Sequence, residues 1–148
     1  MQASCRDAAT ALALAAPDPR LDSLAALWPG PLTLVVRAGQ NCPAALAPGG
    51  WVGLRVPDHP VAAFLLEAAG GPLATSSLNR TSQPPVQTYG AAIASGLADL
   101  VLPPGPLRPS GVASTVIRLE ESGYILLREG AYSGAVIRHL LALLETAE

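Results

Sequence analysis

Lysine is absent from the 148-residue chain, and all nine basic residues are arginine. Eleven acidic residues bring the formal net charge to −2, so the chain lacks the global basic field that marks many nucleic-acid-binding proteins. Aromatic residues make up only 4% of the chain, whereas 50% of the residues are apolar. This composition excludes a disordered chain and predicts a mainly aliphatic core.

Cysteine is scarce as well. Cys5 and Cys42 show neither a CxxC spacing nor a nearby histidine pattern, so the sequence indicates no zinc site and no disulfide framework. A reducing cytoplasm is the simplest setting. No stretch approaches the roughly 20 apolar residues of a membrane span, and no membrane partner is expected. The alanine-rich opening carries Arg6 with Asp7 and no net positive charge, which favours a helix over a signal peptide.

Signatures of common catalytic sites are also missing. No G-x-S-x-G elbow, Walker A loop or G-x-G-x-x-G stretch occurs, so the sequence does not support a serine hydrolase or a common nucleotide-binding fold. His59 stands beside Asp58 at the start of an expected helix, and His139 is expected on the polar side of the last helix. Neither histidine predicts a metal ligand, and no metal site is expected.

The remaining pattern mixes helices and strands. Helices are expected over 4–15 with Ser4 as N-cap, over 21–27, from Asp58 as N-cap to Ala69, from Thr88 as N-cap to Ser95, and after Ser133, where Val136, Ile137, Leu140, Leu141 and Leu144 form an apolar stripe. Strands are expected within 31–39, 51–57, 72–75, 98–105, 112–120 and 124–130, the last two as a hairpin. This order predicts an α/β (α+β) fold, a twisted mixed open sheet flanked by helices, in one domain over 1–148.

Small polar side chains gather where three of these strands end or begin. The stretch "ATSSLNRTSQPP" follows one strand, "SGVASTV" leads into another, and "LREG" finishes a third. Hydroxyl and amide groups can hold a phosphate or a carboxylate, and arginines such as Arg55 and Arg80 could add charge-assisted bonds. Ligands of open α/β sheets tend to bind beyond strand ends, so these loops could share one site. The alternative is that each side chain bonds its own backbone as a turn former, and that the arginines are scattered over a solvated surface.

Four blocks, taken in order, resemble a known family. "LWPGPLTLVV", "GLRVPDHPVAAFLLEAAGGPLATSSLNRTSQPP", "GVASTVIRL" and "LLREGAYS" are similar to successive blocks of the YrdC-domain family, the L-threonylcarbamoyladenylate synthases. The resemblance implies a YrdC/RibB-like fold and the condensation of L-threonine, bicarbonate and ATP to threonylcarbamoyl-AMP and pyrophosphate. Mg²⁺ would accompany the ATP, no permanent cofactor is implied, and the product would serve the N6-threonylcarbamoyladenosine modification of tRNA.

The resemblance also assigns roles to individual residues. Thr75, Ser77, Asn79 and Arg128 match positions that would bind ATP, whereas Thr33 and Ser114 match positions associated with the threonine substrate. Arg55 and Arg80 remain candidates for anion or RNA contacts. No residue is assigned a catalytic role.

Departures from the family pattern raise alternatives. The family's N-terminal segment with a K-x-R motif has no counterpart here, so an N-terminally truncated or diverged member with impaired synthesis is expected. Ser82 stands where the family has glycine, and Glu129 where it has proline. One alternative is a non-catalytic module of the same fold that binds tRNA or double-stranded RNA or assists translation. Another is a partner-dependent subunit or fragment, with a homodimer forming through an exposed sheet edge.

Overall fold

Six short strands form one mixed sheet in the computed structural model, which describes residues 2–105 and 111–145. The order across the sheet is β4-β1-β3-β2-β5-β6. β1 runs parallel to β3 and β2 runs parallel to β5, whereas the other neighbours are antiparallel. The strands are β1 Gln2–Ser4, β2 Leu32–Arg37, β3 Trp51–Arg55, β4 Leu73–Thr75, β5 Thr115–Leu119 and β6 Tyr124–Arg128.

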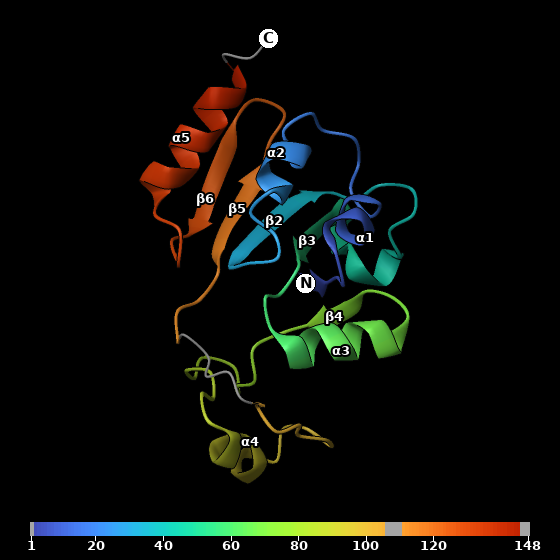
Figure 1. Ribbon diagram of the computed structural model, residues 1–148, viewed down its shortest axis with the longest axis vertical. Helices are drawn as coiled ribbons and strands as arrows, with labels where there is room; N and C mark the ends of the chain where they lie inside the picture. Colours follow the sequence, from blue (N-terminus) through green and yellow to red (C-terminus); the bar gives the residue numbers. More distant parts are fainter. Residues whose placement is uncertain (1, 106–110, 146–148) are drawn as a thin grey trace. The chain divides into compact units, whose positions relative to one another are not determined.

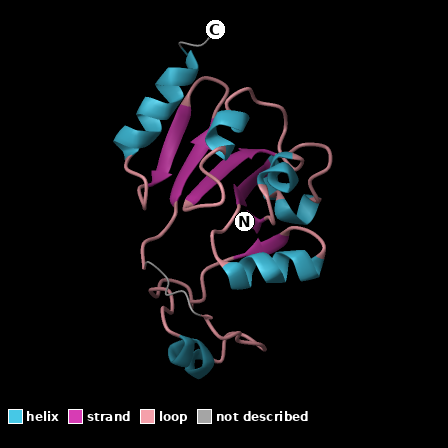
Figure 2. Ribbon diagram, in the orientation of Figure 1, coloured by secondary structure: helices cyan, strands magenta, loops and turns pink. Residues whose placement is uncertain are grey.

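Helices cover one face of this sheet. Ala11 of α1, Leu24 of α2 and Ile137 of α5 belong to the same buried core as the apolar strand residues. Figures 1 and 2 show these three helices lying over the sheet. The helices are α1 Ala8–Leu12, α2 Leu21–Ala25, α3 Pro60–Ala69, α4 Tyr89–Ser95 and α5 Gly134–Glu145, with short 3₁₀ turns at Ala44–Leu46 and Pro48–Gly50.

Alternation along the strands gives the sheet two chemically different faces. Leu32, Leu34 and Val36 of β2 lie in the core under the helices. Because successive side chains of a strand point to opposite faces, Thr33 and Arg37 belong to the other face. The sheet therefore presents polar residues on the face that α1, α2 and α5 leave uncovered.

The chain divides into two compact units. The larger one comprises Met1–Thr75 and Val112–Glu148, and contains the whole sheet. The smaller one comprises Ser76–Gly111 and contains α4. The single domain over 1–148 stays a prediction. Within the described residues no helix is long and apolar enough to cross a membrane.

The mixed α/β fold predicted from the sequence is confirmed, together with most of its elements. Thr88 caps α4 by accepting a bond of 3.2 Å from the Ala91 amide, and Ser133 caps α5 by accepting a weaker bond of 3.4 Å from Val136. β5 and β6 form the expected hairpin around a turn that contains Gly123, whose φ is 89°.

Three details of the predicted elements were wrong. Residues 4–15 do not form one helix, because Gln2–Ser4 pairs as a strand between β3 and β4, and Asp7 rather than Ser4 caps α1. Asp58 is not the N-cap of α3, since the cap position falls on His59 and Pro60 supplies the fixed φ of the first turn. Residues 98–105 form no strand, because two of them are prolines without an amide donor.

The apolar stripe of α5 is only partly buried, and the sheet has two edge strands. In the predicted stripe of α5, Ile137 and Leu141 are buried but Val136 is exposed, and the side chain of Leu144 lies outside the described residues. β4 and β6 are the edge strands, and Leu127 of β6 is exposed. A homodimer through such an edge stays a prediction.

Candidate functional site

Two residues that the sequence associates with threonine meet in the structure. Thr33 Oγ1 lies 3.0 Å from Ser114 Oγ, although the residues are 81 positions apart. They are brought together because β2 and β5 are parallel neighbours, and the amide of Thr115 bonds the carbonyl of Pro31 at 2.9 Å. Both side chains are almost completely buried, with 3% and 2% of their surface exposed. The pair therefore forms a fixed polar point at one end of the sheet.

Arg128 joins this pair from the end of β6. Its Nε donates to the Ser114 carbonyl at 2.9 Å, and its Nη2 donates to Ser114 Oγ at 2.9 Å. Register places Arg128 opposite Val116, which in turn lies opposite Thr33. Arg128, which the family resemblance assigns to the nucleotide, therefore holds Ser114, which the resemblance assigns to the threonine substrate.

The loop after β6 fixes the position of Arg128. A Cβ on Gly130 would stand 2.3 Å from the carbonyl oxygen of Ala113, so only glycine allows this close approach. Thr115 Oγ1 accepts bonds from the Gly130 and Tyr132 amides at 3.1 and 2.9 Å. Glu129 accepts a bond from the Gly134 amide at 3.1 Å, so its carboxylate is engaged at the start of α5.

Arg55, at the end of β3, supplies a second cation on the same face. Its Nε is buried and has no hydrogen-bond partner among the described residues. Burial first, and then the nearby positive charge of Arg128, lowers the pKa of Arg55. A buried guanidinium nitrogen without a partner is costly, and two adjacent cations repel each other. An anion placed at this point would relieve both costs.

The contacts of Arg128, Ser114 and Thr33 continue along β1 as one polar row. Its further members, Gln2 and Ser4, were not predicted from the sequence. Gln2 Nε2 donates to Thr75 Oγ1 at 3.1 Å, and Thr33 Oγ1 donates to Gln2 Oε1 at 3.3 Å. Ser4 Oγ lies 3.0 Å from Thr75 Oγ1. The alternation of polar Gln2 and Ser4 with apolar Ala3 was the available signal, and the predicted helix concealed it.

Ser77, Asn79 and Arg80 belong to the smaller unit and are organised within their own loop. Asn79 Nδ2 donates to the carbonyls of Arg80 and Gln83 at 3.0 and 3.1 Å, and Asn79 Oδ1 accepts from the Ser77 hydroxyl. The turn-forming alternative is therefore confirmed for Asn79. Its contact with ATP, like those of Ser77 and Thr75, stays a prediction.

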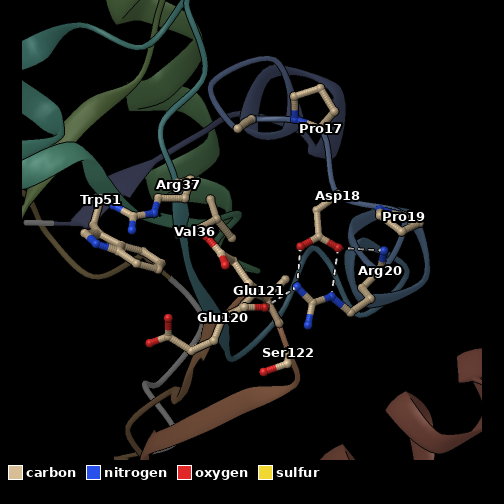
Figure 3. A pocket seen from close by; sticks show the side chains of 12 residues that line it. Pro17, Asp18, Pro19, Arg20, Val36, Arg37, Trp51, Glu120, Glu121 and Ser122 are labelled. Atoms are coloured by element: carbon tan, nitrogen blue, oxygen red, sulfur yellow. Dashed lines mark hydrogen bonds and ion pairs between the residues drawn. The ribbon is translucent and has the colours of Figure 1, made fainter.

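A separate pocket of about 530 Å³ lies at the opposite end of the strands (Figure 3). Arg37, which ends β2, and Trp51, which begins β3, line it together with the loop 16–20 and the turn 120–122. The Arg37 guanidinium stacks 4.2 Å from the centre of the Trp51 ring. Arg20 is bound to Asp18 and to the carbonyl of Glu120 at 2.8 Å. None of the residues predicted to bind ATP or threonine lines this pocket.

No acidic, cysteine or histidine cluster in the described part of the chain could hold a metal ion with three or more ligands. The polar row instead offers hydroxyls, one amide and two guanidinium groups. Such a donor set suits a small anionic ligand rather than a bare cation. The fold and the row together define the class: a mixed-sheet α/β domain with hydroxyl, amide and guanidinium groups gathered at one end of the sheet.

The chain belongs to the Sua5/YciO/YrdC family, whose family model, described as "Telomere recombination", matches residues 1–130. It is 42% identical over 115 residues to a threonylcarbamoyl-AMP synthase of Alkalilimnicola ehrlichii, covering 73% of this chain and 59% of that protein. A threonylcarbamoyl-AMP synthase of Pyrococcus abyssi is 37% identical over 106 residues, covering 70% of this chain and 31% of the relative. The chain thus matches only part of each relative.

Solved structures agree with this assignment. The crystal structure of P. abyssi Sua5 complexed with L-threonine is similar with a TM-score of 0.82 and 28% identity, covering 95% of this chain and 42% of that one. E. coli YciO is similar with a TM-score of 0.75 and 26% identity, covering 88% of this chain and 65% of that one. The sequence-based family resemblance is therefore confirmed.

Proposed function

We propose that this chain takes part in the synthesis of threonylcarbamoyl-AMP from L-threonine, bicarbonate and ATP, for the N6-threonylcarbamoyladenosine modification of tRNA. The names of its relatives support the reaction, and the threonine complex of the similar Sua5 supports the amino-acid substrate. The observation that carries the proposal is the buried Arg55 Nε, which lies beside Arg128 and has no hydrogen-bond partner in the part of the chain that the structure describes. A cytoplasmic location fits the unpaired thiols of Cys5 and Cys42.

In this proposal the carboxylate of threonine binds between Arg55 and Arg128. Two guanidinium groups give charge-assisted bonds, which are roughly twice as strong as neutral ones. Binding would also pair the buried Arg55 Nε and separate the two like charges. The hydroxyls of Ser4 and Thr75, which are bonded to each other at 3.0 Å, could then meet the polar side of the amino acid.

ATP with its Mg²⁺ would bind through Thr75, Ser77, Asn79 and Arg128. The threonine amine takes up CO₂ from bicarbonate to give a carbamate, and a carbamate oxygen attacks the α-phosphate while pyrophosphate leaves. This chemistry mainly requires positioning of the two substrates and neutralisation of charge. In the proposal, Arg128 supplies part of both because its Ser114 bonds hold it in place.

RNA binding is the second candidate function, and one observation favours it. Arg37, Arg55, Arg118 and Arg128 all project from the sheet face that α1, α2 and α5 leave uncovered. Phosphate contacts by such residues would make the affinity fall steeply with salt. Against this candidate, Arg118 is already paired with Glu120 at 2.6 Å, and Arg37 stacks on Trp51.

The test is an assay of pyrophosphate release. The proposal predicts release that requires L-threonine, bicarbonate and ATP together, with mass spectrometry detecting threonylcarbamoyl-AMP. Ser114→Ala should reduce the release because it removes the hydroxyl that accepts from Arg128 Nη2, and leaves only the bond from Nε to the carbonyl of residue 114. The matched control Ser122→Ala, in the turn beside the separate pocket, should leave it unchanged. Release that is absent, or that does not depend on threonine, would overturn the proposal, and tRNA binding lost at high salt would favour the second candidate.

A further inference from the structure

The side chain of Gln2 lies between two hydroxyls of the polar row. Its Oε1 accepts from Thr33 at 3.3 Å and its Nε2 donates to Thr75 at 3.1 Å, so one amide joins residues from β2 and β4. It can do so because Gln2 lies opposite Thr75 of β4 on one side and opposite Gly53 of β3 on the other, where the glycine has no side chain to separate Gln2 from β2. Gln2 itself is partly buried. The amide therefore continues the row that begins at Arg128 and Ser114.

The chemistry of the amide sets the direction of this row. A carbonyl oxygen can only accept, so the single hydroxyl proton of Thr33 is used in its bond to Gln2. Ser114 must then donate its own proton to Thr33 across their 3.0 Å contact. Ser114 Oγ consequently meets Arg128 Nη2 as an acceptor, as its 2.9 Å bond requires. From Arg128 to Thr75, each of these side-chain bonds is donated away from Arg128, and the Thr75 hydroxyl can donate in turn to the Gln2 carbonyl at 3.4 Å.

We propose that Gln2 is a positioning residue that fixes this direction and thereby holds Arg128 and Thr75 for ligand binding. As a consequence, the hydroxyl protons of Thr33 and Ser114 are both used in hydrogen bonds within the row. The charged N–H groups that remain for an anion are those of Arg55 and Arg128. The ligand part of this inference rests on the proposed function, in which L-threonine binds to these N–H groups.

Substitution of Gln2 by glutamate makes the direction testable by pH. A protonated carboxyl group has one donor and one acceptor, like the amide, whereas the carboxylate has acceptors only. Gln2→Glu should therefore bind L-threonine within about twofold of the unaltered chain at pH about 3, below the ordinary glutamate pKa, which the guanidinium groups of Arg55 and Arg128 would lower in this site. At pH about 8 the carboxylate can only accept, so the Thr75 hydroxyl must turn to donate to it, the direction of the row is reversed at Thr75, and binding should be about tenfold weaker.

Two further variants separate positioning from packing. Gln2→Met keeps the length of the side chain but has no amide, so it should bind L-threonine about tenfold more weakly at both pH values. Gln40→Glu adds the same charge on an exposed residue beyond the other end of β2, and should behave like the unaltered chain. Recovery of binding by Gln2→Glu at low pH, but not by Gln2→Met, is a result that a packing role would not produce.

A readout without ligand keeps the inference independent of the proposed function. In the folded Gln2→Glu variant, the methyl resonances of Thr33 and Thr75 should titrate together, and they should not do so in Gln40→Glu. If the unaltered chain binds no L-threonine, the proposed function fails, while the joint titration still decides the role of Gln2. Methyl resonances that do not follow the carboxyl group, or a folded Gln2→Met that binds threonine as tightly as the unaltered chain, would overturn the inference.

Discussion

Replacement of Arg55 by methionine should change stability and ligand affinity in opposite directions. Methionine can fill the space of the arginine stem without bringing a guanidinium into the site. The substitution removes a buried Nε that has no partner among the described residues, and it removes the repulsion between Arg55 and Arg128. The ligand-free protein should therefore become more stable, even though the sheet loses a polar residue of its proposed site.

Both magnitudes can be worked from the structure. An unsatisfied buried polar group costs about 1–3 kcal/mol, so the variant should gain about 1–2 kcal/mol of unfolding free energy after some loss of packing. For a domain of this size that gain raises the melting temperature by roughly 3–6 °C. A charge-assisted bond to the threonine carboxylate contributes about 1.5–3 kcal/mol, so the dissociation constant for L-threonine should rise by about 10–150-fold.

Thermal denaturation and isothermal titration calorimetry measure the two effects on the same preparation. Arg37→Met is the matched control, because it removes one positive charge from the same sheet at the end of β2 distant from Arg55. The control should bind threonine normally and should lose a little stability with its contact to Trp51. An Arg55→Met variant that is less stable than the unaltered chain, with unchanged threonine affinity, would refute the reasoning.

Three further predictions concern other parts of the chain. Hydrogen bonding by Thr10 lowers the pKa of Asp7 to about 2, so its stabilising contribution is complete above the unfolded pKa and is lost as pH falls through the folded one. Asp7→Asn should therefore have a lower melting temperature than the unaltered chain at pH about 5, and the two melting temperatures should converge toward pH about 2. A difference in melting temperature that stays constant with pH would contradict this. Burial, and then the charges of Asp7 and Cys42, raises the pKa of the Cys5 thiol to about 11, so a disulfide reagent at pH about 8 should modify Cys42 first and Cys5 only after unfolding. Ser82 has a φ of 65°, so Ser82→Gly should be as stable or up to about 1 kcal/mol more stable in urea denaturation, and a clear loss of stability would count against strain at this position.

Local signals explain why most of the fold could be predicted. The caps Thr88 and Ser133, the apolar run of β2 and the glycine turn before β6 each determine their element within a few residues. β1 could not be found in this way, because three residues form a strand only when β3 and β4 pair with it from 51 or more positions away. An alanine-rich sequence next to it has high helix propensity and concealed the short alternation.

The candidate site likewise contains residues that could be predicted from the sequence and residues that could not. Thr33, Ser114 and Arg128 were found through the order of family blocks, and the structure joins them by hydrogen bonds. The part played by Gln2 depends on the register of three strand pairs, which no local pattern contains. The burial of the Arg55 Nε without a partner in residues 2–105 and 111–145 likewise results from packing, since the sequence shows an arginine at a strand end but not its burial.

The central claim is that the end of the sheet bearing Arg55 and Arg128 binds L-threonine. Titration of the methyl-labelled protein with L-threonine tests it most directly, with Thr33 and Thr75 as reporters in the row and Thr88 as a reporter in the smaller unit. The account predicts saturable shifts of Thr33 and Thr75 whose midpoint moves to about 10–150-fold higher L-threonine concentration in Arg55→Met. An unchanged midpoint in Arg55→Met, or no shift at Thr33 and Thr75 of the unaltered chain at saturating L-threonine, would contradict it.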